Sequence, residues 1–321
     1  MTRLGMTIPI DGFAMTEQAA VGRDLESLGY TDVWSSEAMG ADPFTPLTVV
    51  AGATSNLRLG TAIASVYARG PACLAQTAAT LAATAPDRFV VGIGSSSKVM
   101  VEQWNDRPFD RPYQRTRDTV RFLKKAFAGE RVDEDFETFG VHGFRLGIVP
   151  PIAPPILVAA LRSKMLQMAG EEADGAIINW LSASDVAVVA PIVHAGGADK
   201  EIVARIMVVP TPDADLARSV GRRMVSTYLT VPVYRAFHEW LGRTDLLADT
   251  WSLWSEGDRK GATAAVPDAV VDDLIVHGTP DECRVKIQRY VEEGVTTPVL
   301  AFLPLEGVDT WDYVRALAPN A

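Results

Sequence analysis

Short apolar runs rich in β-branched residues alternate along the chain with longer segments in which apolar residues recur every three or four positions. The short runs predict strands and the longer segments predict amphipathic helices. Eight strands are expected, at residues 4–8, 30–34, 57–64, 88–93, 156–160, 175–179, 202–209 and 298–302. Strands that alternate with helices form parallel sheets. Eight such units in 321 residues predict an α/β fold, a closed (β/α)8 TIM barrel, better than an open doubly wound sheet.

Local signals place several helix ends. The segment "PYQRTRDTVRFLKKAFAGE" carries one apolar stripe, formed by Tyr113, Thr116, Val120, Leu123 and Phe127. The tetrapeptide "TPDE" at 279–282 is a capping box with proline at the first helical position, and Gly294 is expected to end the helix that follows.

Two insertions interrupt the alternation. Residues 130–155 contain aromatic β-like arms at 136–139 and 144–146 and a proline-rich run, which together predict a hairpin. Residues 212–276 are predicted to be helical. Since no linker separates the segments, a single domain over residues 1–321 is expected.

Composition narrows the classes of function. Lys and Arg number 30 against 40 Asp and Glu, and the net charge of −10 disfavours nucleic acids and anionic membranes as partners. The start has no signal-peptide pattern and no stretch approaches the ~20 apolar residues of a membrane span, so a cytoplasmic protein is expected. Cys73 and Cys283 lie in apolar helical patterns and are predicted to be reduced core residues. The four histidines have no metal-ligand spacing, so no metal site is expected.

A polar break follows the fourth predicted strand, where "RFVVGIG" continues into Ser95, Ser96, Ser97 and Lys98. In a barrel, active sites lie at the carboxyl ends of the strands. Glycine permits close backbone approach there, and hydroxyl and ammonium groups can surround an anionic or ring-carbonyl ligand. A solvated loop with an N-cap serine explains the same residues equally well, and the pattern alone leaves both interpretations open.

Five segments in order resemble the bacterial luciferase-like monooxygenase superfamily, in particular its actinobacterial branch of oxidoreductases dependent on the deazaflavin coenzyme F420. They are "GYTDVWSSE", "NLRLGTAIASVYARGPACLAQTAATL", "DRFVVGIGSSSKVMVEQWNDRPFDRPYQRTRDTVRFLKKAF", "PPILVAALRSKMLQMAGEEADGAIINW" and "HGTPDECRVKIQRYVEEGV". The resemblance covers nearly the whole chain and is weakest at about 210–270.

The resemblance implies hydride transfer between F420 and a small, hydrophobic organic substrate. It also implies a non-prolyl cis peptide between Ala62 and Ile63 that backs the cofactor ring. The remaining residues expected to bind the cofactor follow the fourth and fifth strands: Gly94, Ser95, Ser96, Ser97, Ala159, Ala160, Leu161 and Arg162. Two alternatives stay open, an FMN-dependent monooxygenase of the same superfamily and a flavin-binding protein without turnover. A homodimer is also expected from the resemblance.

The chain departs from relatives that oxidise sugar phosphates or secondary alcohols, because Ala38 follows Glu37 where those enzymes have an acid–base histidine. Glu37 and Trp104 are therefore the predicted catalytic residues, although a strand cap and a core tryptophan are competing explanations. Five further residues are candidates for the mouth of the barrel, each with a structural alternative: Tyr67, Arg69, Asn179, Trp180 and His277.

Overall fold

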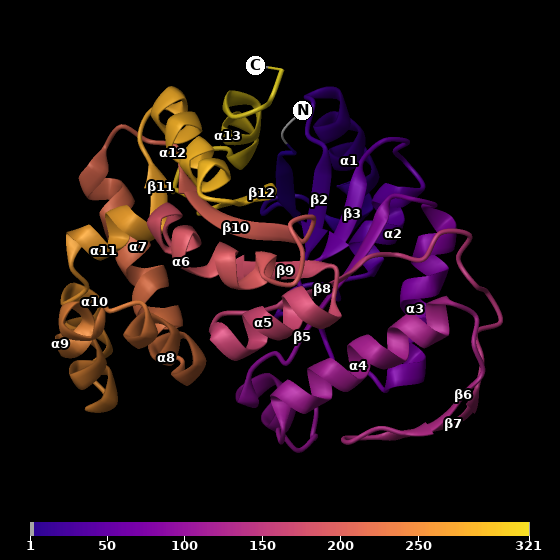
Figure 1. Ribbon diagram of the computed structural model, residues 1–321. Helices are drawn as coiled ribbons and strands as arrows, with labels where there is room; N and C mark the ends of the chain where they lie inside the picture. The colour runs from indigo at the N-terminus through magenta and orange to yellow at the C-terminus, as the bar shows by residue number, and fades with distance from the viewer. Residues whose placement is uncertain (1–2, 321) are drawn as a thin grey trace.

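The computed structural model describes residues 3–320. Its main sheet is a closed ring of eight parallel strands: β1 (Gly5–Ile8), β2 (Asp32–Ser35), β3 (Arg58–Thr61), β5 (Phe89–Gly94), β8 (Ile156–Ala159), β9 (Gly175–Asn179), β10 (Glu201–Val209) and β12 (Thr297–Phe302). The ring closes because β1 pairs with β12 as well as with β2. All eight predicted strands are present, and the predicted (β/α)8 barrel is confirmed (Figure 1).

Helices surround the ring in the order that the alternation predicted. The helices of the outer layer are α1 (Gln18–Ser27), α2 (Thr45–Ala51), α3 (Pro71–Thr84), α4 (Pro112–Phe127), α5 (Ser163–Glu172), α6 (Ala183–His194), α12 (Pro280–Glu292) and α13 (Thr310–Ala316). Two short helical turns, η1 (Met15–Glu17) and η2 (Val99–Trp104), lie after β1 and β5. The capping box at the start of α12 forms, with the Thr279 amide donating to Glu282 Oε2 at 2.7 Å.

The third strand is broken where a single strand was expected. After β3 the chain leaves the ladder for two residues and pairs with β5 again as β4 (Ala64–Ser65). The peptide between Ala62 and Ile63 in this break is cis, as the resemblance implied.

A charged network fills the amino end of the barrel, opposite the mouth. Arg58 Nε donates to Asp32 at 2.5 Å, and its two terminal nitrogens donate to Glu201 at 2.9 Å and 2.5 Å. Glu201 also accepts a hydrogen bond from Thr297. Since these groups lie on four strands, the network joins β2, β3, β10 and β12 across the interior.

The first insertion is a hairpin of β6 (Val132–Asp135) and β7 (Gly140–Phe144). The predicted arms were shifted, because the aromatic residues at 136–139 form the turn. Phe136 and Phe139 both pack edge-on against Phe122 of α4. The aromatic residues of the turn are therefore apolar because they pack on this helix, and in the sequence they look like residues of a strand.

The second insertion comprises α7 (Ala214–Leu229), α8 (Pro232–Trp240), α9 (Thr244–Ser255), α10 (Arg259–Ala264) and α11 (Asp268–Leu274). In Figure 1 these helices form a separate cluster beside the carboxyl end of β10. A short strand, β11 (Ile275–His277), follows them and pairs with the end of β10. The sequence did not predict β11, since three residues are too few to show a period.

The prediction for the cysteines was half wrong. Cys283 is buried, whereas Cys73 lies on the exposed side of α3, because the alanine-rich pattern of that helix did not distinguish its two faces. Between residues 3 and 320, no helix combines the length and the apolar character that crossing a membrane requires.

Candidate functional site

The residues predicted after the fourth and fifth strands lie together at the mouth of the barrel. Strand β5 pairs with β8, with Ile93 opposite Val158, so Gly94 and Ala159 come next to each other. A Cβ atom on Gly94 would lie 2.9 Å from the Cβ of Ala159 and 3.2 Å from Cδ1 of Ile63. The three residues therefore form one closely packed wall, because only glycine at position 94 lets Ala159 and Ile63 approach β5 this closely.

Gly92 explains why the adjacent strand can break. A Cβ at this position would lie 1.9 Å from the carbonyl oxygen of Thr61 and 2.4 Å from Cδ1 of Ile177. The Thr61 hydroxyl donates to the Gly92 carbonyl at 2.8 Å and accepts from the Gly92 amide at 2.9 Å. These two hydrogen bonds replace the backbone hydrogen bonds between β3 and β5 where β3 ends. Only glycine fits at position 92, because any Cβ would overlap the Thr61 carbonyl.

The serine-rich break is partly ordered by its own hydroxyl groups. The Met100 amide donates to Ser97 Oγ at 3.3 Å, and Ser96 Oγ contacts Met100 Sδ at 3.3 Å. Ser96 has a φ of +61°, a left-handed conformation that few residues adopt. Ser95 and Ser96 are half-buried beside Gly94, so the loop has both a capping function and a surface toward the mouth.

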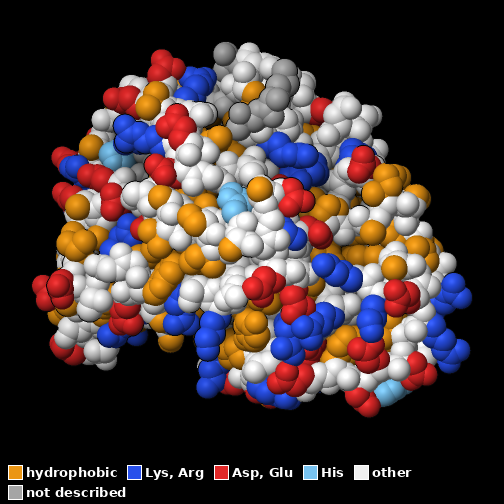
Figure 2. Space-filling view, viewed as in Figure 1, with side chains coloured by type: hydrophobic (Ala, Val, Ile, Leu, Met, Phe, Trp, Pro, Cys, Tyr) orange, Lys and Arg blue, Asp and Glu red, His pale blue; other side chains and the backbone are white. Residues whose placement is uncertain are grey.

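The segment after β8 offers unused backbone donors. The Ala160 amide is bonded to the Ile177 carbonyl at 3.0 Å. The amides of Leu161 and Arg162 have no backbone acceptor among residues 3–320, and they immediately precede α5. A helix start and exposed basic side chains, here Arg162 and Lys164, are typical of phosphate sites. Figure 2 shows a hollow between the α8 helix and the surface over α5, bordered by basic side chains.

Glu37 holds the broken strand in place. Its carboxylate accepts from Arg69 at 2.5 Å and from the Ser65 amide at 2.7 Å, while its own amide donates to the Ile63 carbonyl at 3.2 Å. Both carboxylate oxygens are thus engaged by residues that follow Ile63 in the chain. These contacts hold the segment after Ile63 against Glu37 and identify Arg69 as the ion-pair partner of Glu37.

The two aromatic candidates near this segment lie differently. Trp104 is 52% exposed at the end of η2, so it is not the core residue that the structural alternative required. Tyr67 is buried, and its hydroxyl donates to the Asp110 carbonyl. Burial, with a contribution from Asp110, raises the pKa of Tyr67 to about 12, so this hydroxyl stays protonated near neutral pH.

Asn179 and Trp180 end β9 beside the second insertion. Asn179 Oδ1 accepts from the Trp180 amide at 2.9 Å, and Trp180 has a φ of +57°. The Trp180 ring is buried and stacks on Tyr228 of α7 with centroids 4.5 Å apart. By contrast, His277 lies 2.9 Å from Asp272 through Nε2 and links β11 to α11.

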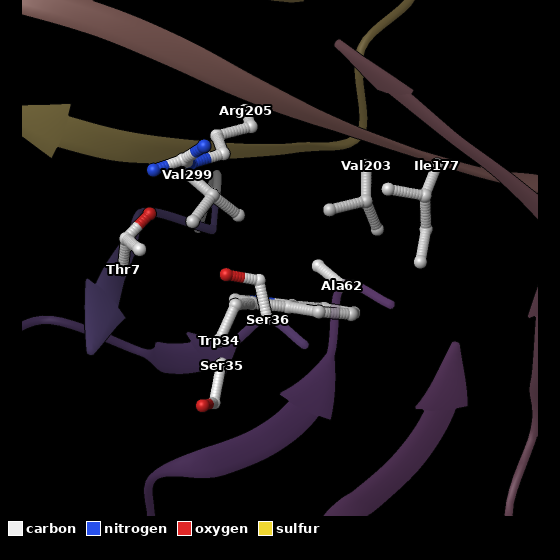
Figure 3. A pocket seen from close by; sticks show the side chains of 9 residues that line it. All are labelled: Thr7, Trp34, Ser35, Ser36, Ala62, Ile177, Val203, Arg205 and Val299. Carbon is white, nitrogen blue, oxygen red and sulfur yellow. The ribbon is translucent and has the colours of Figure 1, made fainter. Parts of the chain in front are cut away.

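Sequence reasoning missed a cavity inside the barrel below this mouth. It is small, with a volume of about 10 Å³, and is lined by Thr7, Trp34, Ser35, Ser36, Ala62, Ile177, Val203, Arg205 and Val299 (Figure 3). One signal was available, because Arg205 is the only charged residue in the apolar run "IVARIMVV" at 202–209. Ala62 connects the cavity to the broken strand described above.

The arrangement suits a phosphate-bearing ligand. The segment before α5 supplies unpaired amides and basic side chains at the mouth, beside the closely packed residues Ile63, Gly94 and Ala159. No set of three or more His, Cys, Asp or Glu side chains within residues 3–320 is placed to hold a metal ion.

Comparison with known proteins agrees with this geometry. The sequence profile of the luciferase-like monooxygenases matches residues 2–297. A 5,10-methylenetetrahydromethanopterin reductase of Archaeoglobus fulgidus is 28% identical over 85% of this chain and 86% of its own length.

Two solved structures share the fold over almost all of both chains. The coenzyme F420-dependent tetrahydromethanopterin reductase of Methanopyrus kandleri has a TM-score of 0.82 at 20% identity, with 99% of this chain and 98% of that chain covered. The oxygenating constituent of 3,6-diketocamphane monooxygenase from Pseudomonas putida, solved in complex with FMN, has a TM-score of 0.68 at 15% identity, with coverages of 100% and 97%.

Proposed function

The chain belongs to the luciferase-like monooxygenase family, and we propose that within it this protein is an F420-dependent oxidoreductase that transfers a hydride to or from a small organic substrate. The single observation that carries the proposal is the pair of unpaired amides that precede α5, beside the wall of Ile63, Gly94 and Ala159 at the mouth. The coenzyme F420-dependent reductase of Methanopyrus kandleri, which shares the fold, supports F420 as the cofactor.

The residues present fit such a cofactor. A Cβ at position 94 would clash with Ala159, so glycine lets Ile63 and Ala159 form a close apolar wall against which a planar ring can lie. The amides of Leu161 and Arg162, with the side chains of Arg162 and Lys164, would hold the phosphate and an acidic tail. When bound, the deazaflavin supplies the hydride chemistry, and the protein supplies binding, orientation and exclusion of competing reactions.

The protein's own groups have defined parts in this function. Glu37 fixes the segment that carries Ile63 through the Ser65 amide and Arg69, and so sets the distance between the ring and the opposite wall. Trp104, exposed just after the serine-rich loop, stays a predicted catalytic residue. Since Ala38 replaces the acid–base histidine of the alcohol-oxidising relatives, we do not propose sugar phosphates or secondary alcohols as substrates.

Titration of the apoprotein with F420 and with FMN tests the proposal. We expect F420 to bind at least tenfold more tightly than FMN, measured by quenching of the intrinsic fluorescence of each cofactor. The second candidate, an FMN-dependent monooxygenase, is favoured by the fold of the FMN-containing neighbour. Tighter binding of FMN would select that candidate, and binding of F420 without turnover of any substrate would favour the flavin-binding protein.

Two variants locate the ring. Ile63→Asp places a charge against it and Ser95→Trp obstructs the mouth, so both should abolish F420 binding. Ser27→Trp is the control, because Ser27 is exposed at the end of α1. Full F420 affinity in both mouth variants would show that the ring lies elsewhere.

We also propose that the protein is cytoplasmic and forms a homodimer. Light scattering should then give about twice the chain mass of 34.6 kDa, and a monomer mass at micromolar concentration contradicts the dimer.

A further inference from the structure

Four polar side chains surround the small space inside the barrel, directly below the mouth. Thr7 of β1 and Trp34 of β2 are register partners on neighbouring strands, and Arg205 of β10 lies across the intervening strand β12, opposite Val299. Ser36 follows β2, and in Figure 3 its hydroxyl points into the same volume as the Thr7 hydroxyl. The space has a volume of about 10 Å³, which is the size that one water molecule requires.

Three polar atoms around this space are buried without a hydrogen-bond partner. Among residues 3–320, Thr7 Oγ1, Trp34 Nε1 and Arg205 Nε make no hydrogen bond, and Trp34 is only 1% exposed. The indole and guanidinium nitrogens can only donate, whereas the hydroxyl can donate and accept. Because an unsatisfied buried donor destabilises the folded state, a partner shared by the three atoms would stabilise it.

The indole nitrogen lies on the side of the Trp34 ring that faces β1. A Cβ at Gly5 of β1 would lie 3.1 Å from Cδ1 of Trp34, whereas a Cβ at Gly60 of β3 would overlap Cε3. Since Cδ1 is bonded to Nε1, the five-membered ring faces β1 and the six-membered ring faces β3. Gly5 and Thr7 are two positions apart and project to the same face of β1. The indole nitrogen is therefore directed toward the strand that carries Thr7.

Arg205 differs from Arg58, which is also enclosed by the strands. Arg58 is paired with Asp32 and Glu201 at the amino end of the barrel, whereas Arg205 has no salt bridge to a carboxylate in the described part of the chain. The Tyr228 hydroxyl of the second insertion lies beside the guanidinium of Arg205, but Nε, on the inner side, is unpaired. A buried charged group is costly unless it is hydrogen-bonded, so a water molecule at Nε would reduce that cost.

We propose that this space binds one water molecule, which accepts hydrogen bonds from Trp34 Nε1 and Arg205 Nε and donates to Thr7 Oγ1 and Ser36 Oγ. Buried waters make two to four hydrogen bonds to otherwise unsatisfied polar groups, and these four groups supply the full set. The water joins β1, β2 and β10 below the mouth. It also fixes the side chain of Arg205 beside β9, where Asn179 is its register partner. The proposal goes beyond the proposed function and does not depend on which cofactor the mouth binds.

A chloride ion is the competing occupant, because all four side chains can donate a hydrogen bond. The volume favours water. A chloride ion has a larger radius than a water molecule, and about 10 Å³ is at the lower limit even for water.

A crystal structure of the apoprotein at high resolution tests the site directly. We expect one peak of electron density at about 2.7–3.2 Å from Trp34 Nε1, Arg205 Nε and Thr7 Oγ1. Crystals soaked in sodium bromide distinguish the two occupants, because bromide replaces chloride and scatters anomalously. The absence of a density peak between these atoms in the wild type overturns the proposal. An anomalous peak at this position assigns the space to an anion instead of water.

Unfolding in urea tests the same hydrogen bonds in solution. Thr7→Val keeps the shape of the side chain and removes the hydroxyl that holds the water, so the urea midpoint should fall by about 0.3–0.5 M. Thr250→Val is the matched control. Among residues 3–320, Thr250 is also fully buried with an unpaired Oγ1, but it lies in α9, outside the residues that line this space. Removal of a hydroxyl that has no partner should leave the midpoint unchanged or raise it. A Thr7→Val midpoint at or above that of the wild type contradicts the proposal.

Discussion

His238 in α8 is expected to make the stability of the protein depend on pH. The residue is fully buried, and among residues 3–320 neither ring nitrogen has a hydrogen-bond partner. Burial, together with the positive charge of Arg243 and opposed by Asp185, lowers the pKa of His238 from 6.5 to about 4. The native state therefore holds the ring neutral at a pH where the unfolded chain binds a proton.

The size of the effect follows from the two pKa values. A difference of about 2.5 units corresponds to about 3.4 kcal/mol at about 1.36 kcal/mol per unit. Because the folded pKa is the lower one, the unfolded state binds more protons between pH 6.5 and 4 and stability falls as the pH is lowered through that window. By pH 4.5 the loss attributable to His238 should be about 2.5 kcal/mol relative to pH 7.5.

Urea unfolding at pH 7.5, 6.5, 5.5 and 4.5, followed by circular dichroism, measures the loss in the wild type and in His238→Leu. The variant should lose about 2.5 kcal/mol less than the wild type between the two extremes, since the carboxylates of both proteins titrate alike. His142→Leu is the matched control, because His142 is exposed on β7, and its curve should parallel that of the wild type. Parallel curves for wild type and His238→Leu would refute the reasoning.

Three further changes test the barrel and its mouth. Gly92→Ala brings a Cβ to 1.9 Å from a carbonyl oxygen of the neighbouring strand and should cost about 3 kcal/mol of unfolding free energy, whereas Gly40→Ala, with no atom within 4 Å, should be near neutral. Burial raises the pKa of Glu201, but the hydrogen bonds and charge of Arg58 outweigh burial and hold this pKa below 4.5. The Arg58–Glu201 pair therefore stabilises the fold above pH 4.5, and this stabilisation is lost as the pH falls through the lowered pKa of the folded state. Glu201→Gln should therefore lower the free energy of unfolding by about 3–5 kcal/mol at pH 7. In urea unfolding, the variant should also lose less stability than the wild type as the pH falls below 4.5. An equal loss in both proteins contradicts the stabilising function of the Arg58–Glu201 pair. Glu37→Gln should weaken F420 binding about tenfold with little loss of stability, and equal affinities in fluorescence titrations would remove Glu37 from the positioning of the ring.

The sequence by itself determined the barrel. Eight β-rich runs and the helical periods between them are local properties, and a parallel alternation of that length has few ways to bury both faces of its strands. The break in the third strand could be located as well, since the segment "GTAIASV" resembles its counterparts in relatives. The same local reasoning misjudged the arms of the hairpin, because aromatic residues such as Phe136 pack against α4 from a turn as readily as from a strand.

Only the tertiary structure decided what individual side chains do. The partners of Glu37 lie 28 and 32 positions away in the chain, so its positioning function was not visible in its own segment. Whether Arg205 had a carboxylate partner depended on which residues β1, β2 and the second insertion bring to its side. Among residues 3–320 Arg205 forms no salt bridge with a carboxylate. Closure of the barrel instead places Thr7, Trp34 and Arg205 around one space, an arrangement that no pattern along the chain could predict.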